Sequence, residues 1–379
     1  MEIRVLNKLE EIRKIAEDWD RLLEKSGVVP LYLNPTWIYN WLKFLGKKDT
    51  PFIIIGTIEK RLIFVLPLST KNVLGPFFRI LRFSGYPSSD HLGYIMDREH
   101  RRESSEGLSA FLKEHKSRWD VGDLAEIPED IFNSSLLSDP DFCLNFEAFK
   151  VMESSVCPYL NIVREWEEFY RERKKRKFRY NIERARRKLE ELGTVEFITL
   201  KTWKEIERYL PQIFDVHRKR WKDYYTGSIF STHSGENFFR IIAKEYITKG
   251  WMDLAVLLLN DQVIAYSYSF KWDGRYFYYN PAYDPKYSNY SPGNLLLIDI
   301  LERLFDKGFK RIDFGRGDLS YKYLWSDDVR QNKRIIFASP HIKGKISYFL
   351  YLGFLFLREK LRKSAFIRRL LSRLSFWKR

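Results

Sequence analysis

Cysteine is scarce in this chain of 379 residues, which contains two of them, Cys143 and Cys157. Two cysteines are too few for a disulfide framework, and no cluster of histidines accompanies them to complete a zinc site. We therefore expect both thiols to be buried and chemically ordinary. The sequence also has no P-loop or HExxH pattern and no evident Ser-His-Asp or Cys-His set. It therefore shows no signature of a P-loop nucleotide site, a zinc protease or a hydrolase with a covalent intermediate.

Long apolar segments are missing as well. The first residues, MEIRVLNKLEEI, have no apolar stretch of the kind found in signal peptides, which predicts a cytoplasmic protein. One apolar run, Ile346 to Leu357, has twelve residues, whereas a helix that spans a bilayer needs about 20. Apolar residues otherwise make up 45% of the chain, so a packed core is expected, and the length fits two domains.

Positive charge is concentrated in two segments. The chain has a formal net charge of +16; residues 341–379 contribute +10 and residues 171–188 contribute +9, which leaves the remainder slightly negative. Basic segments on a nearly neutral body bind phosphates, whether these belong to lipid, nucleic acid or a phosphorylated substrate.

The first 150 residues alternate between helix and strand patterns. Apolar spacing predicts helices over Ile12–Leu23, Pro35–Leu45 and Arg101–His115. Two short runs rich in β-branched residues, Phe52–Ile58 and Leu62–Leu68, predict a hairpin. We expect an α+β or α/β domain that contains an antiparallel pair of strands.

The segment that follows is long, charged and poor in glycine and proline. Val163–Leu192 is predicted to form one extended helix with an apolar stripe, and Gly193 stands where a C-terminal cap is expected. The stripe consists of Phe178, Ile182, Ala185 and Leu189.

The second half shows a clearer order of elements, β-α-α-β-β-β-α-β-α-β. The short turns Asn260-Asp261 and Asp273-Gly274 separate three consecutive strands, which predicts an antiparallel meander. The predicted elements are strand Val195–Leu200, helices Trp203–Trp221 and Glu236–Lys249, strands Met252–Leu259, Gln262–Trp272 and Arg275–Ala282, helix Asn294–Asp306, strand Arg311–Phe314, a short helix at Tyr321–Trp325, and strand Arg334–Ala338.

The C-terminal tail permits two interpretations. Ile367, Leu370, Leu371, Leu374 and Trp377 fall on one helical face with arginines off that stripe, which is the pattern of a helix at a membrane interface. A helix docked on the protein body, with its arginines facing solvent, would show the same pattern. The sequence leaves both open.

Four motifs in the second half carry a family resemblance. In chain order they are DVHRKRW (Asp215–Trp221), IAYSYSF (Ile264–Phe270), YFYYNPAYDPKYSNYSPGNLL (Tyr276–Leu296) and IDFGRGDLSYKYLW (Ile312–Trp325). With the element order, they resemble GNAT-superfamily acetyltransferases of the CelD/BcsL type, which are close to the FemAB peptidyltransferases.

The resemblance covers residues 165–340 and implies an α+β (mixed α/β) fold. FemAB-like proteins pair two GNAT-like domains, each a mixed, mostly antiparallel sheet flanked by helices. The implied segments are an N-terminal GNAT-like domain at 1–160, a basic helix at 161–193, a catalytic GNAT domain at 194–340 and a basic amphipathic tail at 341–379.

The resemblance also implies the chemistry, which is direct attack of an amine, or sometimes a hydroxyl, on the thioester of acetyl-CoA or another acyl-CoA, without a metal. The pyrophosphate of this donor is expected at the helix start Ser291, Pro292, Gly293, Asn294 and Leu295. Helix N-terminal amides bind phosphate, and glycine permits a close backbone approach. A plain helix start with proline at its first position would look the same.

Catalytic residues are expected on the turn after Arg311–Phe314, because strand ends are common ligand sites. Tyr321 could protonate the leaving thiolate, and Asp318 could accept the proton of the amine. Lys322 could stabilise the carbonyl oxyanion or hold a carboxylate or phosphate. The segment YKYLW resembles the aromatic-flanked position of a lysine implicated in FemAB catalysis. The alternative is a solvated charged turn, with Asp313 facing inward as a structural partner.

Substrate-binding residues are expected at His217, Arg220, Trp221, Tyr283 and Arg316. Helical spacing places His217 and Trp221 on one face of the predicted helix. The alternative is an ordinary packed helix surface.

Three functions fit these features. The first is acyl transfer to an amine on a small molecule or cell-envelope polysaccharide precursor, by a cytoplasmic protein that contacts the inner face of an anionic membrane. The second is FemAB-like transfer from aminoacyl-tRNA, the one alternative in which nucleic acid is a partner; the basic segment Arg171–Lys188 would contact tRNA phosphates. FemAB proteins often use a helical hairpin there, whereas this sequence predicts a single helix. The third is a non-enzymatic binding protein with a GNAT fold.

Overall fold

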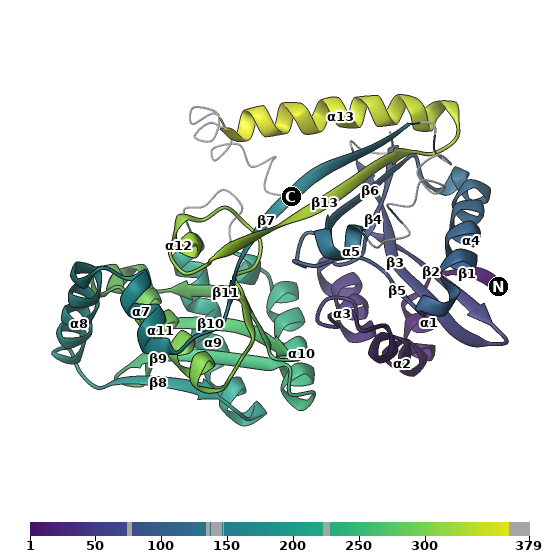
Figure 1. Cartoon of the computed structure of the whole chain (residues 1–379). Coiled ribbons are helices and arrows are strands. Elements are labelled where there is room, and N and C mark those ends of the chain that lie inside the picture. The colour runs from purple at the N-terminus through teal and green to yellow at the C-terminus, as the bar shows by residue number, and fades with distance from the viewer. Residues whose placement is uncertain (74–77, 134–136, 138–145, 147, 223–227, 364–379) are drawn as a thin grey trace. The chain divides into compact units, whose positions relative to one another are not determined.

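The computed structural model describes residues 1–73, 78–133, 137, 146, 148–222 and 228–363 (Figure 1). Cys143 and the predicted stripe from Ile367 to Trp377 therefore lie outside the described residues. Contacts divide the chain into two units. Unit 1 contains Met1–Val156 and the chain from Arg330 through the last helix, and unit 2 contains Cys157–Val329. Cys157 is buried, as expected.

Unit 1 is built on one mixed sheet. Its strands lie in the order β1-β2-β3-β4-β6-β13, and β4 and β6 are the parallel pair among the described ladders. The strands are β1 (Glu2–Leu6), β2 (Thr50–Ile58), β3 (Arg61–Val73), β4 (Phe78–Phe83), β6 (Val121–Ile127) and β13 (Asp328–Ala338), and β5 (Ile95–Met96) pairs with β3. The helices are α1 (Leu9–Lys14), α2 (Ala16–Ser26), α3 (Pro35–Asn40), α4 (Arg101–Glu114), α5 (Glu129–Asn133) and α13 (Ile342–Lys363).

The predicted hairpin in unit 1 is confirmed. Strands β2 and β3 are antiparallel, with Ile58 opposite Arg61. Glu59 and Lys60 at the tip have positive φ angles of 49° and 66°, which a two-residue turn with the twist of its strands requires. The predicted helix Ile12–Leu23 is interrupted at Ile15, where α1 ends and α2 begins.

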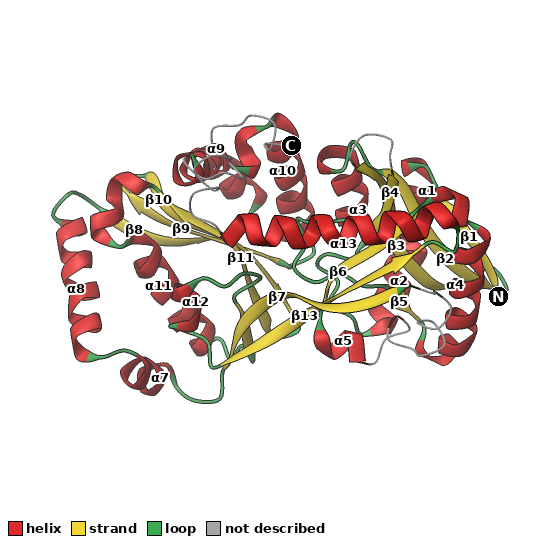
Figure 2. Cartoon of the chain, turned by 90° about the horizontal axis from the view of Figure 1, so that it is seen from above, coloured by secondary structure: helices red, strands yellow, loops and turns green. Residues whose placement is uncertain are grey.

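Unit 2 contains the predicted meander. From β7 (Phe149–Asn161), whose last residues belong to this unit, the order is β7-β12-β11-β10-β9-β8. The strands are β8 (Val195–Leu200), β9 (Met252–Leu259), β10 (Gln262–Trp272), β11 (Arg275–Tyr283) and β12 (Arg311–Asp313), and the helices are α7 (Trp166–Arg173), α8 (Arg176–Glu190), α9 (Trp203–Trp221), α10 (His233–Thr248), α11 (Pro292–Asp306) and α12 (Ser320–Tyr323). Figure 2 shows α9 and α10 on one side of the β8–β10 strands and α11 on the other.

The helix predicted over Val163–Leu192 is wrong in one respect, because the structure has two helices, α7 and α8. The backbone leaves the helical region at Lys174, with φ −119° and ψ 116°. The side chain of Lys174 is drawn inward, where its Nζ donates to the carbonyl oxygen of Leu324 at 2.5 Å. A tertiary contact of this kind overrides helix propensity, which is high throughout the segment.

The apolar stripe of α8 is confirmed, since Ile182, Ala185 and Leu189 are buried. Gly193 follows the helix with φ 150°. A Cβ atom there would lie 2.1 Å from the side chain of Asn260, so this position needs glycine for the close approach of the β9–β10 turn.

The boundaries of the two units lie at different residues from the domain boundaries expected from the sequence. Residues from Arg330 through α13 belong to unit 1, although the sequence grouped residues up to 340 with the catalytic domain. β13 accounts for the difference, because its residues from Lys333 to Ala338 pair with β6. Independent folding of the predicted domains remains a prediction.

Candidate active site

The parallel strands β11 and β12 define the candidate site in unit 2. They pair over three positions, Arg275 to Phe277 with Arg311 to Asp313. Strand β12 ends at Asp313, whereas β11 continues to Tyr283, and α11 is the crossover helix between them. Ligands in α/β sheets bind beyond the carboxyl ends of such strands. The start of α11 and the turn after β12 both follow those ends.

Strand β11 has a β-bulge just after Phe277, its last residue that pairs with β12. Phe277 lies opposite Phe270, but Asn280 lies opposite Tyr268, so β11 carries one extra residue at Tyr278-Tyr279. Bulges re-aim side chains and are frequent beside active sites.

The start of α11 contains the five predicted phosphate-binding residues. Ser291 has the left-handed conformation, with φ 50° and ψ 42°. Its carbonyl oxygen accepts hydrogen bonds from the amides of Asn294 at 3.0 Å and Leu295 at 3.1 Å. Because Pro292 has no amide hydrogen, Gly293 is the first helical residue that can offer its N–H to a ligand.

Three predicted residues from three elements meet at this helix start. The ring of Tyr283, at the end of β11, lies 3.1 Å from where a Cβ of Gly293 would be. The guanidinium of Arg220, on α9, lies over the same ring, 4.9 Å from its centroid. Glycine is thus needed here for the packing of Tyr283, as well as for any ligand. The arrangement places a cation beside the helix N-terminus.

Two carboxylates near this cluster were not predicted from sequence. Lys219 of α9 forms ion pairs with Asp215 at 2.8 Å and with Asp284 at 3.0 Å. Asp284 directly follows Tyr283, so the ion pair between Lys219 and Asp284 connects the end of α9 to the end of β11. Asp215 lies one helical turn before Lys219, but the sequence contains no local signal for the contact of Lys219 with Asp284, which is 65 positions away.

His217 and Trp221 are packed together, as helical spacing predicted, with ring centroids 5.8 Å apart. His217 is buried, and its Nδ1 shares a hydrogen bond of 2.6 Å with the hydroxyl of Ser228. Burial, followed by the charge of Arg218, lowers the pKa of His217 to about 3, so its ring is neutral. These contacts favour the packed-surface alternative for His217.

The turn after β12 is held from both sides. The carboxylate of Asp313, which is buried as the structural alternative expected, accepts a hydrogen bond from the amide of Gly315 at 2.8 Å. The Nζ of Lys322 donates to the carbonyl oxygens of Gly315 at 2.9 Å and of Arg316 at 2.6 Å. Lys322 is also buried. Its ammonium therefore acts on the backbone of the turn.

Tyr321 and Asp318 differ sharply in their surroundings. Tyr321 packs against the core cluster that includes Phe314 and Tyr278, and burial raises its pKa. The hydroxyl consequently keeps its proton and can act as a donor. Asp318 is exposed and accepts a hydrogen bond from Tyr323.

Lys174 is a buried cation that sequence reasoning missed. Its Nζ lies 3.7 Å from the ring centroid of Trp325 and 5.1 Å from that of Phe178. Burial, and then the neighbouring charge of Arg173, lowers its pKa to about 8. One lysine within the run KKRK carries no distinguishing local pattern, so only the tertiary contact identifies it.

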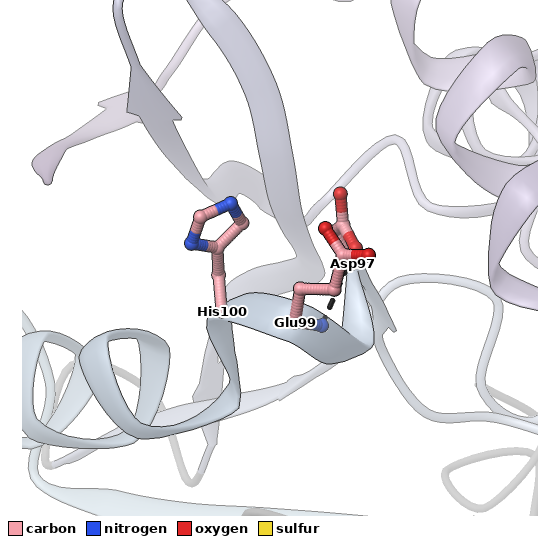
Figure 3. Close-up of side chains that lie close together, drawn as sticks. All are labelled: Asp97, Glu99 and His100. Carbon is pink, nitrogen blue, oxygen red and sulfur yellow. Dashed lines mark hydrogen bonds between the residues drawn. The ribbon is translucent and has the colours of Figure 1, made fainter.

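Asp97, Glu99 and His100 in unit 1 are close enough to suggest a metal site (Figure 3). The carboxylate of Asp97 already pairs with Lys25 at 2.8 Å and with Arg61 at 3.3 Å. The hydrogen bond from Lys25 contributes most to the lowered pKa of Asp97. Two cations thus occupy the place that a metal ion would take, and we assign an ion-pair cluster here.

Comparison with known proteins supports the fold. Residues 176–323 match the family model described as an acetyltransferase (GNAT) domain. The crystal structure of FemX is similar with a TM-score of 0.56 and 10% identity, over 88% of this chain and 97% of that one. A conserved protein of unknown function from Bacteroides thetaiotaomicron has a TM-score of 0.54 and 10% identity, over 89% and 100% of the two chains.

The structure of L-PGS from Bacillus licheniformis is also similar, with a TM-score of 0.51 and 13% identity over 88% of this chain and 94% of that one. At such identities the likeness establishes the fold alone. No curated protein matches the sequence. The chain thus has a mixed α/β, GNAT-like architecture, and its residues 176–323 match the model of a GNAT acetyltransferase domain.

Proposed function

We propose that unit 2 is a GNAT-type N-acyltransferase that uses acetyl-CoA or another acyl-CoA, of the CelD/BcsL type. The observation that carries the proposal is the β11-α11-β12 crossover within the matched GNAT domain, where the two parallel strands stop pairing at Asp313. Two sets of polar residues follow the carboxyl ends of these strands. One suits a phosphate-bearing donor and the other suits proton transfer.

The donor would lie against the start of α11. Ser291 to Leu295 supply the helix start, and Arg220 supplies a positive charge beside it. A helix N-terminus and a guanidinium both attract phosphate. Tyr283 and Trp221 are the aromatic members of the expected substrate-binding set, and His217 packs against Trp221.

The reaction is direct transfer. The amine nitrogen attacks the thioester carbonyl carbon, a C–N bond forms, and the C–S bond breaks when the tetrahedral intermediate collapses. The amine loses one proton and the thiolate gains one, which gives an amide and a free thiol. No covalent enzyme intermediate is needed, so the reaction depends on orientation and proton transfer.

We assign the proton-transfer roles to the turn after β12. Tyr321 would protonate the thiolate, because its hydroxyl carries a proton at neutral pH and lies on the turn that follows β12. Asp318 is exposed and would accept the proton of the amine. Lys322 was expected to stabilise the oxyanion, but its bonds to Gly315 and Arg316 support a positioning role instead.

The acceptor would be an amine on a small molecule or on a cell-envelope polysaccharide precursor, reached by a cytoplasmic protein at the inner face of the membrane. Among the residues that the structure describes, no helix has the length and apolar character needed to cross a bilayer. A peripheral location is supported by the basic C-terminal segment.

Transfer from aminoacyl-tRNA is the second candidate, and α8 favours it. This helix buries Ile182, Ala185 and Leu189 and turns its basic residues outward. The exposed ones are Arg176, Lys177, Arg184, Arg187 and Lys188. Such a surface would bind tRNA phosphates with a strong dependence on salt.

The proposed reaction is tested by thiol release. The full chain is incubated with acetyl-CoA and a panel of amino sugars, and free thiol is measured with and without each amine. Amine-dependent release that slows in Tyr321→Phe, but not in Tyr180→Phe on the exposed side of α8, supports the proposal. If no acyl-CoA is consumed while aminoacyl-tRNA is deacylated by an added amine, the second candidate replaces it.

A further inference from the structure

Helix α13, which precedes the predicted stripe Ile367–Trp377, is docked on unit 1 through its inner face. Tyr348 and Tyr351 are buried in a cluster of unit 1 with Ile80, Val121 and Ile336. The hydroxyl of Tyr351 donates to the carboxylate of Asp123 at 2.6 Å. This helix is therefore an integral part of the unit 1 core.

The outer face of the same helix is apolar and exposed. Six large apolar side chains on it have exposed fractions between 54% and 80%. They are Ile342, Ile346, Phe349, Leu350, Phe356 and Leu357. Counted from Ile342, they fall at i, i+4, i+7, i+8, i+14 and i+15, which is one stripe along a helix, about 22 Å long at 1.5 Å per residue. A contiguous apolar stripe of this size marks an interaction site.

We propose that this outer face is the surface through which the chain lies on an anionic lipid bilayer. The inference rests on the peripheral location proposed above, but not on the acyl-transfer reaction. The docked tyrosines fix the helix with its apolar stripe outward. The helix would thus lie in the interface plane with the six side chains below the headgroups.

The charge around the stripe matches an anionic surface. Lys343, Arg358 and Lys360 are exposed on α13, and the ammonium of Lys360 lies 4.5 Å from the ring centroid of Phe356. By sequence, residues 341–379 hold eleven lysines and arginines and one glutamate. Basic residues that flank an apolar helix face add attraction to anionic headgroups.

The same charge argues against a second copy of the chain as the occupant. Two copies joined through this face would bring two segments of net charge +10 together. Like charges across an interface oppose association. An anionic bilayer complements both the apolar stripe and the charge.

The test uses point variants of the full chain, because truncation before α13 would remove Tyr348 and Tyr351 from the core. Phe349→Gln with Leu350→Gln removes two stripe residues. Val163→Gln with Leu192→Gln is the matched control, since both residues are exposed and apolar but lie in unit 2. Co-sedimentation is measured with vesicles of phosphatidylcholine alone and with equal parts of phosphatidylcholine and phosphatidylglycerol.

The wild-type chain and the control should bind the anionic vesicles, and binding should weaken but persist at high salt. The stripe variant should partition at least about tenfold more weakly, and its remaining binding should vanish at high salt. Equal binding by stripe variant and wild type overturns the proposal while leaving a membrane location open. Loss of a dimer in the stripe variant, with vesicle binding unchanged, assigns the face to a second copy and also overturns it. Thermal unfolding of both variants near the wild-type temperature confirms that they are folded.

Discussion

The ammonium of Lys322 lies 2.9 Å from the carbonyl oxygen of Gly315 and so ties the first turn of α12 to the end of β12. A second bond, of 2.6 Å, reaches the carbonyl of Arg316. The residues proposed for proton transfer, Asp318 and Tyr321, lie on the segment that these bonds close. The geometry of the turn therefore depends on a side chain that need not touch the substrate.

Lys322→Ala should lower turnover at least about tenfold, equivalent to about 1.4 kcal/mol of barrier. It should also destabilise the unit by about 1–3 kcal/mol, because two carbonyl groups lose their partner. Lys307→Ala, at the end of α11, is the control and should change neither quantity. Turnover is measured by thiol release and stability by urea unfolding. Normal turnover in a folded Lys322→Ala variant would remove this turn from the active site.

Asp318→Asn should reduce turnover at least about tenfold, because an amide cannot accept the proton of the amine. Little change in stability is expected, since the side chain is exposed. Tyr323→Phe removes the hydrogen bond to Asp318 but leaves its carboxylate, and should retain most activity. If Asp318→Asn turns over normally, another group accepts the proton.

Gly293→Val should block donor binding in a folded protein, and Gly293→Ala should weaken it. The added Cβ would lie 3.1 Å from the ring of Tyr283, so the ring must move toward the proposed donor position. Gly353→Ala, where nothing lies within 4 Å of the added Cβ, is the control. Calorimetric titration with acetyl-CoA gives the affinity. Unchanged affinity in a folded Gly293→Val variant means that the donor binds elsewhere.

Stability should depend on pH through Lys174. Its native pKa of about 8 is below the ordinary value of 10.5, so between these two values the unfolded chain binds more protons than the native one. The contribution of Lys174 to the free energy of unfolding therefore rises as pH increases from about 8 to 10.5. Below pH 8 the lysine is charged in both states and its contribution is flat.

Urea unfolding of wild type and Lys174→Met across this range checks the prediction. The difference in free energy of unfolding, wild type minus variant, should rise with pH. Lys175→Met, which changes the exposed neighbour, should show a constant difference. A constant difference for Lys174→Met as well would mean that its charge is not disfavoured in the native state.

Much of unit 2 could be predicted from sequence because its signals are local. The turns Asn260-Asp261 and Asp273-Gly274 determine the meander, and the positive φ angles of these residues are what such turns require. The period of apolar residues likewise identified α9 and α11. The order of strands and helices followed from these patterns, and the GNAT-like fold was implied by the family resemblance of this order and of the four motifs.

Contacts between distant residues could not be predicted. The break at Lys174 depends on Trp325 and Leu324, about 150 positions away. The packing of Tyr283 against Gly293 and the hydrogen bond from Lys322 to the carbonyl oxygen of Gly315 were not predicted either, because the turns that bring these residues together have no distinctive sequence pattern. The exposed apolar face of α13 could not be predicted, because the sequence did not show which face of this helix packs on unit 1.

Thermal unfolding with acetyl-CoA, CoA and aminoacyl-tRNA tests the central claim most directly. A ligand present at about 100 times its dissociation constant stabilises the native state by about 2.7 kcal/mol, which raises the Tm by several degrees in a unit of this size. We predict that acetyl-CoA and CoA raise the Tm and that Arg220→Ala reduces the rise. Stabilisation by aminoacyl-tRNA alone, with no response to either CoA ligand, would contradict the assignment of an acyl-CoA donor.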